Sequence, residues 1–73
     1  MNKPSLWVDV KKGLPPIGVD VLITAYDHVP AKTEYDVACL TEDGRWANRF
    51  GYWYDPVLVG HWQALPPLPE EEE

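Results

Sequence analysis

The sequence is poor in the residues that give small proteins covalent staples or catalytic groups. Its 73 residues include one cysteine, Cys39, which excludes an intramolecular disulfide and a cysteine-rich metal site. The one serine, Ser5, lies near the start of the chain, and the two histidines, His28 and His61, lack the spacing of a zinc finger. There is no glycine-rich phosphate loop. We therefore expect a protein that is not an enzyme and has no metal site or cofactor.

Cys39 has two interpretations. With His61 it would supply a thiol and an imidazole, but nothing in the sequence supplies a third group to orient such a pair. Cys39 lies in the apolar run of residues 37–40, where a cysteine usually packs as a small hydrophobic side chain. We therefore prefer a structural role for Cys39.

Long apolar runs are missing as well. The longest, such as Val21-Leu22-Ile23, fall far short of the roughly 18 residues that cross a bilayer. At the start of the chain, Asp9 interrupts the only apolar stretch, so a secretory signal is not expected. These features predict a cytoplasmic protein with no membrane association.

Basic residues are scarce, and acidic residues gather at one end. The net charge is -6, and Glu70 to Glu73 carry four of the twelve acidic charges. Residues 1–69 then hold eight acids against six bases. Because no basic patch is available to neutralise phosphates, direct nucleic-acid binding is not expected. The glutamates at 70–73 indicate a solvated acidic tail.

Short β-favouring runs between glycine and proline turns fill most of the chain. No stretch of about ten residues shows helical periodicity without a proline or glycine. We expect a single, mainly β domain over residues 1–69, with four or five antiparallel strands in meander order and at most one short helical turn. The expected strands cover residues 6–10, 19–26, 35–41, 45–50 and 57–62.

Two local patterns sharpen this expectation. In the strand over 19–26, the apolar side chains of Val19, Val21, Ile23 and Ala25 share one face, which predicts a core-facing side. The run Glu42-Asp43-Gly44 predicts a hairpin turn, because glycine accepts the positive φ that such turns require.

The proline-rich segment 65–69 predicts an extended C-terminal tail of the polyproline type. It contains a minimal P-x-x-P pattern, which other proteins could bind in an aromatic groove. No base accompanies that pattern, and four glutamates follow it. We therefore expect Leu65, Pro66 and Leu68 to pack back onto tryptophan side chains of the same chain.

His61 and Trp62 are neighbours in the last expected strand, so their side chains should point to opposite faces. Strict alternation places His61 with Val57 and Val59, which favours a buried His61 and an outward Trp62. With either orientation, we expect the pair to anchor the structure rather than to catalyse a reaction.

Aromatic residues are in surplus, with four tryptophans, four tyrosines and one phenylalanine. We expect nine aromatic side chains to exceed what one small core can hide, and such a surplus is typical either of an undersized core being capped or of a contact surface. The contact surface that we expect lies around the hairpin and the loop after it, and comprises Arg45, Trp46, Arg49, Tyr52, Trp53 and Tyr54.

The order of landmarks resembles a family of short phage and prophage proteins, the domain-of-unknown-function family 551. The residues that carry this resemblance are Trp7-x-x-Val10, Leu14-Pro15-x-x-Gly18, Asp43-Gly44-Arg45-Trp46 and His61-Trp62-x-x-Leu65-Pro66. The chain departs from the usual His-Trp-Met-Pro-Leu-Pro ending at Gln63 and Ala64, and also in the loop from Asp27 to Glu34.

The resemblance implies a phage or prophage accessory gene expressed in a bacterium, and it brings no catalytic residues. It also implies that the first strand and the tail meet, with Trp7 and Trp62 near the Leu-Pro segments. The structural framework that it suggests comprises Trp7, Pro15, Gly18, His61, Trp62 and Pro66.

Three functions are compatible with the sequence. The first is a non-enzymatic accessory protein that binds a host or defence protein through the aromatic surface. The second is an oligomer that sequesters a nucleotide-like ligand, with the aromatic rings stacking the base and Arg45, Arg49 or Lys32 binding the phosphate. The third is a structural homo-oligomer in which exposed aromatic side chains bury one another.

Overall fold

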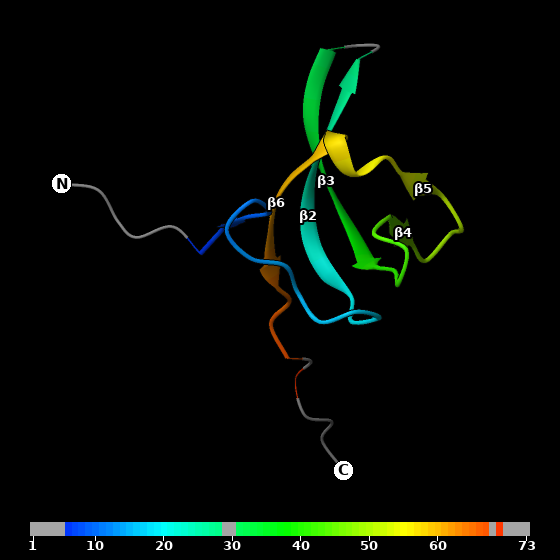
Figure 1. The fold of residues 1–73 in the computed structure, drawn as a ribbon. Coiled ribbons are helices and arrows are strands. Elements are labelled where there is room, and N and C mark those ends of the chain that lie inside the picture. Colours follow the sequence, from blue (N-terminus) through cyan, green and yellow to red (C-terminus); the bar gives the residue numbers. More distant parts are fainter. Residues whose placement is uncertain (1–5, 29–30, 68, 70–73) are drawn as a thin grey trace, which may run out of the picture.

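The computed structural model describes residues 6–28, 31–67 and 69, which form one antiparallel β-sheet (Figure 1). The mainly β, antiparallel class is therefore confirmed, and the helical content of the described residues is a single 3-10 turn. The elements are β1 (Val8–Asp9), β2 (Val21–His28), β3 (Ala31–Leu40), β4 (Trp46–Asn48), β5 (Trp53–Tyr54), η1 (Pro56–Leu58) and β6 (Val59–Ala64).

The strand order is β1-β6-β2-β3-β4-β5, which differs from the prediction in two respects. Strands β2 to β5 follow one another as a meander, but β6 crosses back and inserts between β1 and β2. The described residues form six strands rather than four or five, because Trp53–Tyr54 pairs with β4 as a further short strand. The first strand pairs with the last, with Val8 opposite Trp62, whereas residues 65–67 of the tail, which were expected to meet the first strand, are exposed.

One face of the sheet, here called the inner face, carries the core. As predicted, Val21, Ile23 and Ala25 of β2 are buried there, whereas Val19 precedes the strand and is exposed. The remaining buried hydrophobic side chains are those of Ala38, Leu40, Trp46 and Val59.

The segment between β1 and β2 is fastened over the inner face by two hydrogen bonds. The indole Nε1 of Trp62 donates to the carbonyl of Gly13 over 2.9 Å. The Gly18 N–H donates to the Leu40 carbonyl, also over 2.9 Å. Between these two points Pro15 is buried. The segment therefore covers the core without regular structure of its own.

A β-bulge at Gly60 reverses the predicted orientation of His61 and Trp62. Ala25 pairs with Val59 and Thr24 pairs with His61, so Gly60 is an extra residue on β6. The extra residue interrupts the alternation, and Trp62 therefore joins Val59 on the inner face. His61 is exposed, and the favoured prediction of a buried His61 is wrong.

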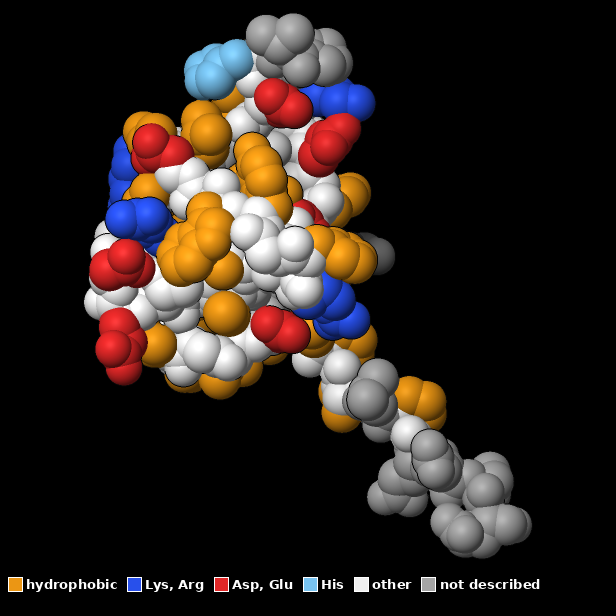
Figure 2. Space-filling view, turned by 90° about the vertical axis from the view of Figure 1, so that its right-hand side faces the viewer, with side chains coloured by type: hydrophobic (Ala, Val, Ile, Leu, Met, Phe, Trp, Pro, Cys, Tyr) orange, Lys and Arg blue, Asp and Glu red, His pale blue; other side chains and the backbone are white. Residues whose placement is uncertain are grey.

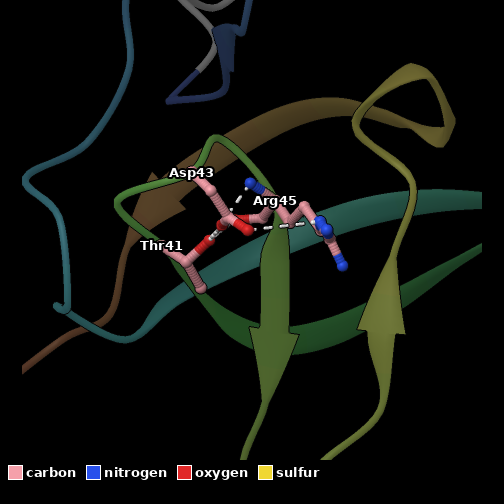
Figure 3. A network of polar contacts seen from close by, with 3 residues as sticks. All are labelled: Thr41, Asp43 and Arg45. Atoms are coloured by element: carbon pink, nitrogen blue, oxygen red, sulfur yellow. Dashed lines mark hydrogen bonds and ion pairs between the residues drawn. The ribbon is translucent and has the colours of Figure 1, made fainter.

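The predicted turn at Glu42-Asp43-Gly44 is confirmed, and Figure 3 shows its polar contacts. Gly44 has a φ of 86°, and the Thr41 N–H donates to the Arg45 carbonyl over 2.7 Å. The Thr41 hydroxyl donates to the Asp43 carboxylate, which also lies 3.3 Å from Nε of Arg45. These contacts within the turn fix the register of β3 against β4.

The tail follows β6 away from the sheet (Figure 1). Ala64 pairs with Val21, the first residue of β2, so no neighbouring strand remains beyond it. Pro66 and Pro67 have no N–H with which to extend a ladder. Residues 65–67 are exposed, so the predicted packing of Leu65 and Pro66 onto the body is not found. Leu68 and the acidic tail 70–73 lie outside the described residues.

Within the described part of the chain, no helix has the length and apolar character needed to cross a membrane.

Candidate functional site

The predicted aromatic surface separates into buried and exposed members. Trp46 is only 2% exposed and packs in the core, because its position opposite Leu40 turns its side chain to the inner face. It therefore belongs to the core and not to the contact surface. Tyr54 is half-buried, while Tyr52 and Trp53 are 59% and 49% exposed.

Tyr54 is held in place by Asp36 on β3. The Tyr54 hydroxyl and Nδ2 of Asn48 both donate to Oδ2 of Asp36, the latter over 3.0 Å, and the Val37 N–H donates to Oδ1 over 2.7 Å. Asp36 therefore joins β3 to the β4–β5 hairpin just where the pairing of β3 with β4 ends.

The Asp36 contacts shift the acidity of both partners. Burial opposes ionisation of Asp36, but the hydrogen bonds from Tyr54, Asn48 and Val37 outweigh it, so the pKa of Asp36 lies below its ordinary value. Burial, followed by the hydrogen bond to Asp36, raises the pKa of Tyr54. At neutral pH the pair is thus a carboxylate that accepts from a protonated phenol.

Hydrogen bonds made by Asn48 close the turn between β4 and β5. Its side-chain Oδ1 accepts from the N–H of Phe50 over 3.0 Å and from the N–H of Tyr52 over 2.9 Å. Its backbone carbonyl accepts from the Gly51 N–H over 3.1 Å, and its own N–H donates to the Tyr52 carbonyl over 2.9 Å. Gly51 adopts the positive φ of 86° that closes this turn.

This hydrogen-bonded turn presents Phe50, which is 86% exposed and is the most exposed large hydrophobic side chain of the described residues. We name Phe50, Tyr52 and Trp53 the hairpin surface. Figure 2 views the molecule from the side on which β4 and β5 lie in Figure 1, and hydrophobic side chains are exposed there among charged ones. The sequence prediction omitted Phe50, although Asn48-x-x-Gly51 is a turn signal that could have revealed it.

The basic residues predicted for phosphate binding all have acidic neighbours. Nε of Arg45 lies 3.3 Å from Asp43, and the Arg45 guanidinium also lies 5.4 Å from the centre of the Trp53 ring. The remaining pairs are Arg49 with Asp20 at 3.8 Å and Lys32 with Glu34 at 2.6 Å. A phosphate at any of these cations would have to compete with a carboxylate.

The predicted framework residues lie in three places. Pro15, Gly18 and Trp62 belong to the inner face and to the segment fastened over it. Pro66 lies in the exposed tail. Trp7 and His61 line a hollow of about 380 Å³ together with Asp9, Lys12 and Thr24.

In that hollow, His61 lies opposite Asp9 and Thr24 on the neighbouring strands, which places it on the outer face of the sheet. The Trp7 ring stacks on the Tyr35 ring, with centroids 6.0 Å apart and planes inclined by 13°. The hollow mixes a carboxylate, an imidazole and an ammonium group, so its charges do not favour one class of ligand.

Metal ligands do not gather in the part of the chain that the structure describes, where no three His, Cys, Asp or Glu side chains are placed to hold an ion. Cys39 is half-buried on β3. No protein-family model, no curated protein and no solved structure matches this chain, so the family resemblance remains a prediction.

Proposed function

We propose that this chain is a non-enzymatic protein-binding module and that the hairpin surface is its contact surface. The observation that carries the proposal is the turn closed by the Asn48 hydrogen bonds, at which the Phe50 side chain is exposed to solvent. A flexible loop could fold its aromatic side chains back onto the body, whereas this turn keeps them outward.

The energetics favour such a role. Burying a Phe side chain that was exposed contributes roughly 1.5–3 kcal/mol, and aromatic anchors dominate the affinity of many interfaces. Because the turn is already ordered, a partner need not immobilise it on binding. Trp53 adds a second anchor, and Arg45 beside it offers hydrogen-bond donors for the rim of a contact.

The biological setting of the proposal comes from the family resemblance. It suggests a phage or prophage accessory protein in the bacterial cytoplasm, whose target is a host or defence protein. The exposed aromatic hairpin supports a protein target over a nucleotide-like ligand, because each basic residue predicted to bind phosphate already has a carboxylate neighbour.

A pull-down from bacterial lysate tests the proposal. The bait is the full chain, compared with Phe50→Ala/Trp53→Ala and with Val57→Ala, which truncates a side chain that is 83% exposed outside the hairpin. We expect the wild type and Val57→Ala to retain the same bacterial protein and the double variant to lose it. Recovery of that protein by the double variant, or of none by the wild type, would overturn the proposal.

A further inference from the structure

A second hollow adjoins the hairpin surface. It has a volume of about 380 Å³, and its walls include Tyr26, Asp27, Glu34, Tyr52 and Tyr54. It forms because the β2–β3 hairpin runs on beyond β4, which pairs only with the last three residues of β3, Ala38 to Leu40. Tyr52 belongs both to this hollow and to the hairpin surface, so the two are continuous.

The charged side chains that line this hollow are acidic. Asp27 and Glu34 line it, and the register places Ala25 opposite Glu34 and Asp27 opposite Lys32, all on one face. Lys32 binds Glu34 at 2.6 Å, and its side chain stays half exposed. The hydrogen bond to Glu34 and its charge raise the pKa of Lys32, and the charge of Asp27 adds to this.

The aromatic walls suit the same kind of ligand as the carboxylates. Tyr52 and Tyr54 meet edge to face, with ring centroids 4.8 Å apart, and the bond to Asp36 holds Tyr54 still. A tyrosine ring face attracts a lysine ammonium or an arginine guanidinium, and a carboxylate adds a charge-assisted hydrogen bond. Anionic groups are repelled, both by the hollow and by the net charge of -6.

We infer that this hollow receives a lysine or arginine side chain of the protein partner, next to the apolar contact that the hairpin surface makes at Tyr52. The inference rests on the proposed function and adds the chemistry of the partner: a basic residue flanked by hydrophobic ones. Lys32 is then an internal competitor for Glu34, because its ammonium group occupies the carboxylate that the partner would use.

The test uses a defined probe, the acetylated and amidated peptide (Lys-Leu)4, with (Glu-Leu)4 as its charge-reversed control. Amide chemical shifts of the ¹⁵N-labelled chain are followed during titration. We expect the basic peptide to shift amides of Asp27, Glu34 and Tyr52 first and the acidic peptide to shift none of them. Shifts spread evenly over all acidic residues would overturn the inference.

Matched variants give the sign of the effect. Asp27→Asn/Glu34→Gln should weaken binding of (Lys-Leu)4 about threefold to tenfold, since each exposed ion pair contributes little. Asp20→Asn/Glu42→Gln removes the same charge outside the hollow and should change affinity less than about twofold.

Lys32→Gln should strengthen binding of (Lys-Leu)4, and Lys11→Gln should strengthen it less. Equal weakening by the two double variants would refute the hollow as the site.

The two proposals fail in different ways. If the lysate experiment recovers no partner but the titration maps to the hollow, the proposed cellular function is wrong and the preference for basic side chains stands. If a partner is recovered through Phe50 and Trp53, yet Asp27→Asn/Glu34→Gln retains it in full, the hairpin surface stands and the hollow is not part of the contact.

Discussion

At the scale of single residues, Asp36 illustrates how one side chain serves several elements. It accepts hydrogen bonds from Tyr54, Asn48 and Val37, and so connects β3, β4 and β5 at the point where their regular pairing ends. Nothing in the sequence distinguishes Asp36 from the other acids, because its partners on the other strands lie 12 and 18 residues away. Its role depends on the register of the sheet, and sequence reasoning missed it for that reason.

Asp36 should make stability depend on acid pH. Its pKa is lower in the folded chain than in the unfolded chain, where an aspartate titrates near about 3.9. The stabilisation is therefore complete well above that pH and is lost as the pH falls through the folded value. We expect urea unfolding to show wild type more stable than Asp36→Asn at pH 6, with the difference shrinking below about pH 3.9. A difference independent of pH would contradict the assigned bonds.

Trp62 and His61 give a second test at this scale. Replacing Trp62 with Phe keeps an aromatic ring on the inner face but removes the donor to the Gly13 carbonyl. The free energy of unfolding should therefore fall by about 1 kcal/mol or more. His61→Ala changes an exposed side chain and should stay within about 0.5 kcal/mol of wild type. Thermal unfolding of both variants measures these changes in stability. A larger loss for His61→Ala would mean that the bulge at Gly60 is wrongly placed.

At the scale of elements, the long strands with regular alternation could be predicted from the sequence. Very short strands and bulges could not. Most of β2, the second half of β3 and the turn at Gly44 follow from local pattern and turn chemistry. The predicted loop from Asp27 to Glu34 is wrong, because β2 runs on to His28 and β3 begins at Ala31. The two-residue strand β5 is too short to show a period. The bulge at Gly60 had one signal, a glycine inside a strand pattern, but strict alternation outweighed it and gave the wrong face for His61.

The β4–β5 turn gives the prediction for this scale. Asn48→Ala removes the acceptor for the Phe50 and Tyr52 N–H groups and the donor to Asp36. We expect a loss of roughly 1–3 kcal/mol in unfolding free energy and faster hydrogen exchange of the Tyr52 amide. Thr33→Ala, on the β2–β3 hairpin, is a suitable control. Unchanged exchange at Tyr52 in Asn48→Ala would show that the turn does not depend on this side chain.

At the scale of the whole molecule, composition predicted the class of fold but not the distribution of its surface. Of the surplus aromatic residues, Trp46 is buried in the core, whereas Phe50, Tyr52 and Trp53 are exposed to solvent. Which aromatic residue goes where depends on pairing: Leu40 opposite Trp46 fixes the inner face, and the next residue on β4 turns outward. The sequence therefore predicted a contact region and could not separate its exposed members from its buried one.

The central claim is that the hairpin surface contacts another protein, and a photo-crosslink tests it most directly. Phe50 is replaced by p-benzoylphenylalanine, which keeps the aromatic ring, and Val57 by the same residue as an equally exposed control. The chain is expressed in bacterial cells and irradiated. We expect a crosslink to a different protein from position 50 and not from position 57. No crosslink from position 50, the same crosslink from both positions, or a crosslink only to a second copy of this chain would contradict it.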